Sequence, residues 1–404
     1  MGPTDGLTRL DDALAHLLPQ AHAVAEKQVR RLEDAGGQIL ANDISVPADV
    51  PPADNSAVDG YAIRLADLAN QPLPVSQRIP AGVAPQPLEP GTVARIFTGA
   101  SVPDGAEAVL MQEHASVDDA GLRTDHALSP GQNIRPRGQD LRAGSMALAA
   151  GTRLRPQELG LLASLGIAEI SVRRPVRVAI LTTGDELVPP GQPLPPGKIY
   201  NTNRFALRAL LESLHCEVVD LGDVADTREA TRTALEQAAT QSDLILSSGG
   251  VSVGEEDHVR GAMEALGDVS LWRLAVKPGK PLAFGRIGTT PMLGLPGNPA
   301  AVLVTFLIIA APFIRRLQGR SDTPAAALAL PAGFSVDRAS PRREFVRARR
   351  VERDGQTRIE AYPNQSSGML SSACWADGLA VVPENTRVAP GDTLAFYPFN
   401  DLLG

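Results

Sequence analysis

The sequence predicts a multidomain protein of the α/β plus β class, built around a doubly wound, mostly parallel sheet. Its 404 residues exceed what one ordinary core requires. Residues 176–319 alternate apolar strand-like runs, glycine turns and helical stretches, which is typical of a parallel sheet with helices on both faces. Residues 44–140 and the chain after 319 consist of short apolar runs broken by Pro and Gly, which indicates β-rich modules.

The N-terminal region has helical spacing. Between residues 10 and 35, Leu10, Leu14, Leu17 and Leu18 recur at intervals of three and four, so we expect helices to open the chain. After the β-rich region, residues 156–167 predict a short helix with Pro156 in its first turn, and residues 169–178 suit a domain boundary.

The predicted α/β domain follows in regular order. Strands are expected at the apolar runs and helices at the amphipathic stretches. The strand-like runs are 176–181, 217–222, 243–246 and 291–295, and the helical ones are 204–214, 227–241, 256–267 and 300–314. After residue 319, the runs 344–352, 357–363, 378–383 and 392–399 predict a small terminal β domain.

Composition excludes several classes of function. The formal net charge is -8 and Lys and Arg are scattered, which argues against a nucleic-acid partner. Cys216 and Cys374 form no CxxC pair, so neither a disulfide framework nor a zinc site is indicated, and a reducing compartment fits. The six histidines lack HxxxH or HExxH spacing, which argues against a histidine metal centre.

We expect a cytoplasmic protein without a membrane anchor. The first 20 residues have neither the basic nor the apolar region of a signal peptide. The most apolar stretch, residues 300–314, contains Thr305 and Pro312 and is shorter than the ~20 residues of a spanning helix. It predicts a buried helix.

Three glycine-bearing turns follow predicted strands, at residues 183–186, 247–250 and 295–299. Ligands of open α/β sheets bind outside the carboxyl ends of the strands, and glycine lets backbone N–H groups approach a phosphate. Each turn alone could simply end a strand. Three turns in one α/β unit favour a crevice for an anionic ligand.

Charged residues accompany these turns. Lys277 and Lys280 lie around a glycine-hinged turn, where they are either solvated loop lysines or ligands of an oxyanion, and the apolar flanks favour the second reading. Glu186, Asp226 and Asp257 could hold Mg²⁺ against phosphate oxygens, with ordinary surface charge as the alternative.

Two acids of the β-rich region also lie beside glycines. Asp59 stands in NSAVDGYAI and Asp140 in RPRGQDLRAG. For each, a turn-forming aspartate and a metal ligand are both consistent with the sequence.

The chain resembles the MoeA and gephyrin E-domain family throughout. The motifs that carry the resemblance are NSAVDGYA, RIFTGA, RPRGQD, TGDEL, SSGGVSVGEED, KPGKP and LPGNP, in this order. The resemblance implies an elongated homodimer of four-module chains. The implied modules are a helical stem (residues 1–44 with 141–174), an inserted β-rich domain (45–140), a molybdopterin-binding α/β domain (175–322) and a C-terminal β barrel (323–404).

The resemblance also implies an activity, that of a molybdopterin molybdenumtransferase. Such an enzyme inserts molybdate into adenylyl-molybdopterin, with Mg²⁺-dependent release of AMP, to form molybdenum cofactor. Molybdopterin adenylyltransferase and molybdoenzyme maturation proteins are the implied partners.

Site residues follow from the motifs. The implied catalytic residues are Asp59, Asp140, Glu186, Lys277 and Lys280, of which Asp59, Asp140 and Glu186 would hold the metal. The implied substrate- and cofactor-binding residues are Thr98, Thr183, Gly184, Asp226, Ser248, Gly249, Gly250, Asp257, Pro281, Pro296, Gly297, Asn298, Arg347 and Ser367.

Some features depart from the family pattern. Asn201 and Thr202 stand where many relatives carry Asp and Ser, which could alter pterin contacts, and Gln139 stands where Glu is expected. Two other functions compete with the transferase. A non-catalytic molybdopterin-binding or scaffold protein of gephyrin type would have an appended partner-binding linker. A molybdopterin adenylyltransferase shares the TGDE and SSGG turns but lacks the NSAVDGYA and RPRGQD modules.

Overall fold

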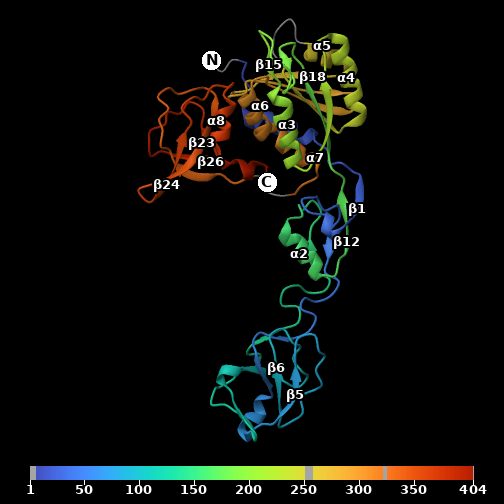
Figure 1. Cartoon of the computed structure of the whole chain (residues 1–404), viewed down its shortest axis with the longest axis vertical. Coiled ribbons are helices and arrows are strands. Elements are labelled where there is room, and N and C mark those ends of the chain that lie inside the picture. Colours follow the sequence, from blue (N-terminus) through green and yellow to red (C-terminus); the bar gives the residue numbers. More distant parts are fainter. Residues whose placement is uncertain (1–5, 251–257, 322–324, 404) are drawn as a thin grey trace.

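The computed structural model describes residues 6–250, 258–321 and 325–403 of the chain. It is elongated (Figure 1), with the α/β domain and the C-terminal domain side by side at one end, a stem in the middle and the inserted β domain at the far end. Near the two ends of the described chain, residues 10–17 and 399–403 both pack against the core of the α/β domain.

A six-stranded sheet forms the α/β domain, in the order β16-β13-β17-β21-β20-β18. The first four strands are parallel and the last two are antiparallel to their neighbours. In that order the strands are β16 (Glu217–Asp223), β13 (Arg177–Thr182), β17 (Leu244–Ser248), β21 (Thr290–Leu295), β20 (Pro281–Ile287) and β18 (Val269–Arg273).

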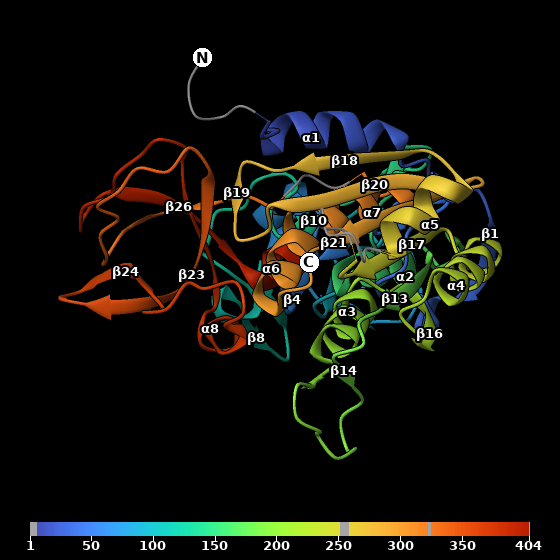
Figure 2. The ribbon, with the colours of Figure 1, turned by 90° about the horizontal axis from the view of Figure 1, so that it is seen from above.

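Helices cover both faces of this sheet, so the doubly wound prediction is confirmed. One face packs against α1 (Leu10–Leu17), α3 (Thr202–Ser213), α6 (Pro299–Thr305) and α7 (Ala311–Leu317) in one apolar cluster. The other packs against α4 (Arg228–Gln241) and α5 (His258–Leu266) in a second cluster. Helix α1 lies along the α/β domain beside β18 (Figure 2) and not in the stem, where the resemblance placed it.

The long apolar segment is a core helix, as predicted. Helix α6 passes through a π-helical turn, Phe306–Ala310, into α7. Within the described part of the chain, one helix, Pro299–Leu317, is long and apolar enough to cross a membrane. Of its most apolar 18-residue stretch, 78% is buried inside the protein. Pro312 has no N–H to donate, so the regular ladder is interrupted and a π turn fits there.

The stem is less helical than predicted. After α1 and a 3₁₀ turn (Leu18–Gln20), residues expected to be helical form strand β1 (Lys27–Arg31), which pairs antiparallel with β12 (Glu169–Arg173). Strand β12 lies about 140 residues after β1 in the sequence. The hydrogen bonds between the two strands stabilise the extended conformation of residues 27–31 more than their weak helical pattern stabilises a helix. Helix α2 (Pro156–Ser164) begins with Pro156 as expected, and β2 (Ile44–Ser45) pairs with β11 (Met146–Leu148).

The inserted domain is β-rich, as expected. Its main sheet has the order β5-β6-β4-β7, and its two faces pack in separate small cores. The strands are β5 (Val75–Ile79), β6 (Val93–Ile96), β4 (Gly60–Ile63) and β7 (Ala108–Met111), with the pairs β3 (Asn55–Ser56) and β10 (Ile134–Arg135), and β8 (Ser116–Asp118) and β9 (Gly121–Arg123).

The C-terminal domain is a small curved sheet in which β22 pairs with β26, β26 with β25, β25 with β23, and β23 with β24. An isolated bridge between Ala332, just after β22, and Ile359 in β24 joins the two ends, so the sheet closes on itself. The strands are β22 (Leu328–Pro331), β23 (Arg343–Arg353), β24 (Gln356–Ala361), β25 (Gly378–Val382) and β26 (Thr393–Pro398), and the short helices are α8 (Leu370–Trp375) and α9 (Phe399–Leu403).

A short parallel pairing joins this domain to the α/β domain. Strand β19 (Val276–Lys277) leads into the KPGKP turn and pairs with the start of β23, at Arg343 and Glu344. The C-terminal domain is thereby held against the loop that carries the two expected oxyanion ligands.

Candidate functional site

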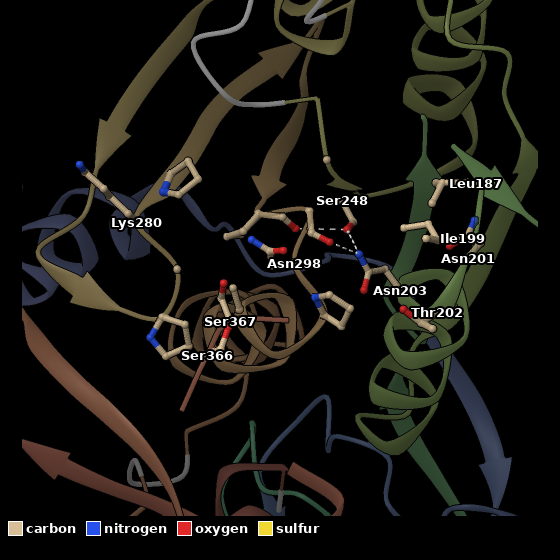
Figure 3. Close-up of a pocket in the computed structure, with 18 of the residues that line it drawn as sticks. Leu187, Ile199, Asn201, Thr202, Asn203, Ser248, Lys280, Asn298, Ser366 and Ser367 are labelled. Carbon is tan, nitrogen blue, oxygen red and sulfur yellow. Dashed lines mark hydrogen bonds between the residues drawn. The ribbon is translucent and has the colours of Figure 1, made fainter. Parts of the chain in front are cut away.

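A pocket of about 610 Å³ opens where the carboxyl ends of the parallel strands meet the C-terminal domain. Residues from both domains surround it (Figure 3), with Lys280 at one end and Leu187 and Thr202 at the other. Its remaining walls come from the strand-end turns, from β15 (Ile199–Tyr200) and the start of α3, and from residues 365–367 of the C-terminal domain.

The three glycine turns converge on this pocket, as expected from the sheet topology. Thr183 of the first, Ser248 and Gly249 of the second, and a segment of the third line it. The third turn contributes Pro296, Gly297 and Asn298. Gly184 and Gly250, which were also expected at the site, adjoin these residues in the chain without lining the pocket, and both have positive φ.

Asn203 holds two of these turns together, although sequence reasoning did not single it out. Its Nδ2 donates to Ser248 Oγ at 2.8 Å and to the Gly297 carbonyl at 2.6 Å. Ser248 Oγ in turn donates to the Pro296 carbonyl at 3.2 Å. These bonds (Figure 3) fix the strand-end loops in a preorganised arrangement. The signal in the sequence was the polar NTNR run at the start of α3.

The departures at Asn201 and Thr202 lie at the same edge. Asn201 is buried, caps α3 by accepting from the Arg204 N–H at 3.2 Å, and donates to Thr182 Oγ1 at 2.9 Å. An asparagine therefore performs the capping that aspartate would also perform. Thr202 lines the pocket.

The KPGKP turn forms the opposite end of the pocket, where Lys277, Lys280 and Pro281 all line it. Lys277 Nζ lies 3.1 Å from Glu344 Oε2. The Gly279 backbone packs so closely on Thr305 that an added Cβ would lie 2.3 Å from its methyl group, which explains the glycine of this motif.

The C-terminal domain contributes Ser367, as expected, together with Gln365 and Ser366. Arg347 has a different place from the one expected. It is 1% exposed and does not line the pocket. Its Nε donates to Ser372 Oγ at 2.9 Å and its Nη2 to the Ser366 carbonyl at 3.0 Å. Burial lowers the pKa of Arg347 to about 10, which leaves the side chain protonated at neutral pH.

The expected acids are dispersed. Glu186 lines the pocket, and its carboxylate lies against the Gly184 α-carbon, since an added Cβ there would be 2.6 Å from Oε2. Asp226 does not line the pocket, and it has a contact of its own within the protein. Asp257 lies outside the described residues.

Asp59 and Thr98 adjoin β4 and β6 of the inserted domain, which lies at the opposite end of the elongated molecule from the α/β domain (Figure 1). Asp140 follows β10, and its N–H donates to the Val50 carbonyl. The Thr98 N–H and hydroxyl both donate to Asp59 Oδ1 at 2.8 Å. These bonds, the backbone one first, hold the pKa of Asp59 below its usual value. Asp140 is exposed and lines a separate hollow of about 550 Å³ that Gln139 shares.

A single chain therefore does not assemble the expected metal site. Across residues 6–250, 258–321 and 325–403, no group of three His, Cys, Asp or Glu side chains could hold a metal ion. The segments that carry Asp59 and Asp140 belong to the inserted domain, and the stem separates that domain from the α/β domain, which carries Glu186 (Figure 1). Within one chain, these three residues do not fit a common Mg²⁺ ion.

Comparisons with known proteins agree with this architecture. Residues 8–166 match the model of the MoeA N-terminal region (domain I and II), residues 179–316 that of a probable molybdopterin binding domain, and residues 329–399 that of the MoeA C-terminal region (domain IV). The molybdopterin molybdenumtransferase of Haemophilus influenzae is 41% identical over 402 residues, which cover 98% of this chain and 99% of the relative. The chain belongs to the MoeA family of molybdopterin molybdenumtransferases.

Other MoeA-family proteins extend the likeness. Molybdopterin molybdenumtransferase 2 of Mycobacterium tuberculosis is 36% identical over 384 residues, covering 91% of this chain and 93% of the relative. The crystal structure of a molybdopterin biosynthesis MoeA protein from Pyrococcus horikoshii OT3 superposes with a TM-score of 0.83 at 28% identity, covering 97% of this chain and 100% of that one. The expected family and the multidomain α/β architecture are thus confirmed.

Proposed function

We propose that this pocket inserts molybdate into adenylyl-molybdopterin, with Mg²⁺-dependent release of AMP. The observation that carries the proposal is that the two ends of the pocket are lined by different chemical groups. Glycine-bearing turns line its strand-end wall, while two lysines and a serine line the end that faces the C-terminal domain. A pterin phosphate and a metal oxyanion are both anionic, and they can be held by different walls of one cavity.

The strand-end wall suits the pterin substrate. Ser248 ends β17, Gly249 follows it, and Asn298 precedes α6, so backbone and side-chain donors line the cavity at the amino end of a helix. Such donors bind phosphate groups. A volume of about 610 Å³ is in the range of sites for compounds of this size.

The lysine end suits molybdate. Ammonium groups and serine hydroxyls bind tetrahedral oxyanions by charge-assisted hydrogen bonds. Lys280 and Ser367 come from different domains, and the β19–β23 pairing fixes their separation. Both oxyanion ligands are then in place before substrate binds.

We further propose that the working site is composite and that the protein is a homodimer. Asp59 and Asp140 lie far from the pocket of their own chain. A twofold arrangement supplies each pocket with a neighbour's carboxylates, and only then could they join Glu186 around Mg²⁺. The ion, when bound, would neutralise charge on the phosphate oxygens. The chain itself would supply the oxygen ligands.

The wider biological setting is also a proposal. We propose a cytoplasmic enzyme that receives its pterin substrate from a molybdopterin adenylyltransferase and passes the product to molybdoenzyme maturation proteins. The composition supports this by giving no sign of a nucleic-acid or disulfide-dependent function. The gephyrin-type scaffold is the alternative function. The pocket is lined by the strand-end turns, by Lys277 and Lys280, and by Ser367, and this set of polar groups favours the enzyme.

Purified protein mixed with adenylyl-molybdopterin, Mg²⁺ and molybdate tests the function directly. AMP should appear, and the product should reconstitute an apo-molybdoenzyme, in amounts that depend on all three additions. A scaffold would bind the pterin without releasing AMP or forming active cofactor, and that result would exclude the proposed transferase.

A further inference from the structure

Arg174 lies at the junction between the stem and the α/β domain, and its side chain is 14% exposed. The chain leaves the α/β domain after α1, enters the stem at β1, and returns from β12 to β13. Arg174 follows the pair of Arg173 with Lys27 that ends the β1–β12 ladder. Its backbone N–H donates to the Glu26 carbonyl at 3.2 Å. Arg174 therefore lies where both connecting segments meet the domain.

The guanidinium of Arg174 bonds to both sides of this junction. Its Nη1 and Nη2 donate to the two carboxylate oxygens of Asp243, at 2.6 and 2.8 Å. Asp243 directly precedes β17 of the α/β domain. The Nε of Arg174 donates to Glu26 Oε2 at 2.5 Å, on the segment that enters the stem. One planar group thus connects the two crossing segments to the amino end of β17.

The Asp243 carboxylate is held as firmly as the guanidinium. It also accepts a hydrogen bond from the Arg177 N–H at 2.8 Å, and its side chain is 20% exposed. Burial opposes its ionisation, but the bonds from Arg174 and from the Arg177 N–H hold the pKa of Asp243 below its usual value. The pair is therefore charged at neutral pH, and its two-point geometry restricts rotation at the junction.

Packing alone does not fix the angle between the stem and the domain. A cavity of about 320 Å³ opens between residues 36–39 of the stem and residues 215–217 of the α/β domain, and Arg173 and Arg174 line it. In a closely packed interface, side-chain volume decides how two bodies meet. Here the interface is incompletely filled, so the angle depends more strongly on the polar contacts of Arg174.

Arg174 is remote from the substrate pocket but can influence it through the stem. Asp243 lies at the amino end of β17, whereas Ser248 at the carboxyl end of the same strand lines the pocket. The stem carries the inserted domain at the far end of the molecule (Figure 1). A small rotation at the junction therefore displaces the inserted domain by a much larger distance.

We propose that Arg174 is a positioning residue: by joining the stem to Asp243, it determines where the inserted domain presents Asp59 and Asp140 to the pocket of a second chain. The proposal rests on the proposed composite site. Misplacing a catalytic group by about 1 Å can slow a reaction on the order of a hundredfold. Loss of Arg174 should therefore slow AMP release, while the pocket of each chain still binds its substrate.

Steady-state kinetics of AMP release test this separation. Arg174→Gln should lower kcat roughly 10- to 100-fold and leave the KM for adenylyl-molybdopterin nearly constant. Arg174→Lys should recover part of the rate, because an ammonium can bond to Asp243 but cannot match its two oxygens with a planar fork. The matched control is Arg177→Gln, which removes an exposed ion pair with Glu217 at 3.3 Å and should keep the full rate.

A distance measurement reports the position of the stem directly. Spin labels are attached through Asp119→Cys in the inserted domain and Gln237→Cys on α4, both exposed, in a Cys374→Ser background. Labelled chains are diluted with unlabelled protein, so that distances within one chain dominate. The distribution of distances should broaden in Arg174→Gln and in Asp243→Asn. The double variant should be no more affected than Asp243→Asn, because both substitutions break the same contact.

The two measurements together decide the proposal. A distance distribution that Arg174→Gln leaves unaltered would overturn it. A broadened distribution with full-speed AMP release would also overturn it, as would a raised KM with an unaltered kcat. If thermal melting shows that Arg174→Gln does not fold, Arg174→Lys and Asp243→Asn provide the same test. If the unsubstituted protein releases no AMP, the proposed function fails, and the distance distributions still decide whether Arg174 fixes the stem.

Discussion

The guanidinium Nε of Arg347 donates a 2.9 Å hydrogen bond to Ser372 Oγ in the interior of the C-terminal domain. The bond connects β23 to α8, and the same guanidinium holds the Ser366 carbonyl at the pocket wall. A buried arginine thus links the core of one domain to the site that it shares with another.

Arg347→Lys should destabilise the C-terminal domain by about 3 kcal/mol, because lysine keeps the buried charge but cannot reach both acceptors of the planar fork. The comparison is Arg349→Lys on the same strand, whose ion pair with Glu360 is longer, at 3.6 Å, and partly exposed, and should contribute less than about 1 kcal/mol. Calorimetric unfolding measures both variants. Equal stabilities for the two would contradict a positioning role for Arg347.

Lys280→Gln should raise the molybdate concentration needed for half-maximal activity while leaving the affinity for adenylyl-molybdopterin nearly unchanged. The reason is that Lys280 lies at the end of the pocket away from the strand-end turns. Titration calorimetry with each substrate measures the effect, with Lys27→Gln in the stem as control. The reverse pattern, with pterin affinity lost and molybdate affinity kept, would assign Lys280 to the pterin.

Asp59→Asn and Asp140→Asn should each slow AMP release on the order of a hundredfold, as expected for the loss of one electrostatic contact to the reacting phosphate. Asp119→Asn, an exposed aspartate of the same inserted domain, should release AMP at the unchanged rate. The measurement is AMP formed per enzyme at saturating substrates and Mg²⁺. Full-speed release by both variants would remove these carboxylates from the mechanism.

Mixed dimers test the composite site. Asp59→Asn and Lys280→Gln are each expected to be impaired, and the two substitutions lie in domains at opposite ends of the elongated molecule. If sites are shared between chains, each mixed dimer has one site with both lesions and one with neither, so activity partly returns after subunit exchange. Sites contained within single chains would leave every site with one lesion, and the mixture would be no more active than its parents.

Stability should fall as the pH drops below the usual histidine range, through His215. Burial, followed by the charges of Arg153 and Arg320, lowers the pKa of His215 from 6.5 in the folded protein. Below about pH 6.5 the unfolded chain therefore binds a proton that the folded chain resists, and stability is lost as the pH falls through this range.

His215→Asn should flatten this part of the pH dependence, because asparagine does not titrate and tolerates the positive φ of 56° at this position. Melting temperatures of both proteins measured between pH 5 and 8 provide the test. The fall in melting temperature over this range should be smaller for His215→Asn by on the order of a few degrees. A pH dependence identical to that of the unchanged protein would show that His215 is not the titrating group.

Local patterns were sufficient for much of this protein. The alternation of apolar runs, glycine turns and helical stretches in residues 176–319 predicted the doubly wound domain, because strands buried on both faces and amphipathic helices leave period-specific patterns. The topology of such a sheet also predicted that the three strand-end turns would converge, as Thr183, Ser248 and Asn298 do.

Tertiary structure decided the rest. Residues 27–31 form a strand because of a partner about 140 residues away, which no local window contains. Arg342, Arg343 and Arg347 are alike in sequence, yet one lines the pocket, one pairs with Asp11 and Glu384, and one is buried against Ser372. Their roles depend on strand alternation and on the pairing of β23 with β19. These are contacts between distant segments, and their energies are set by packing and burial that a sequence pattern does not record.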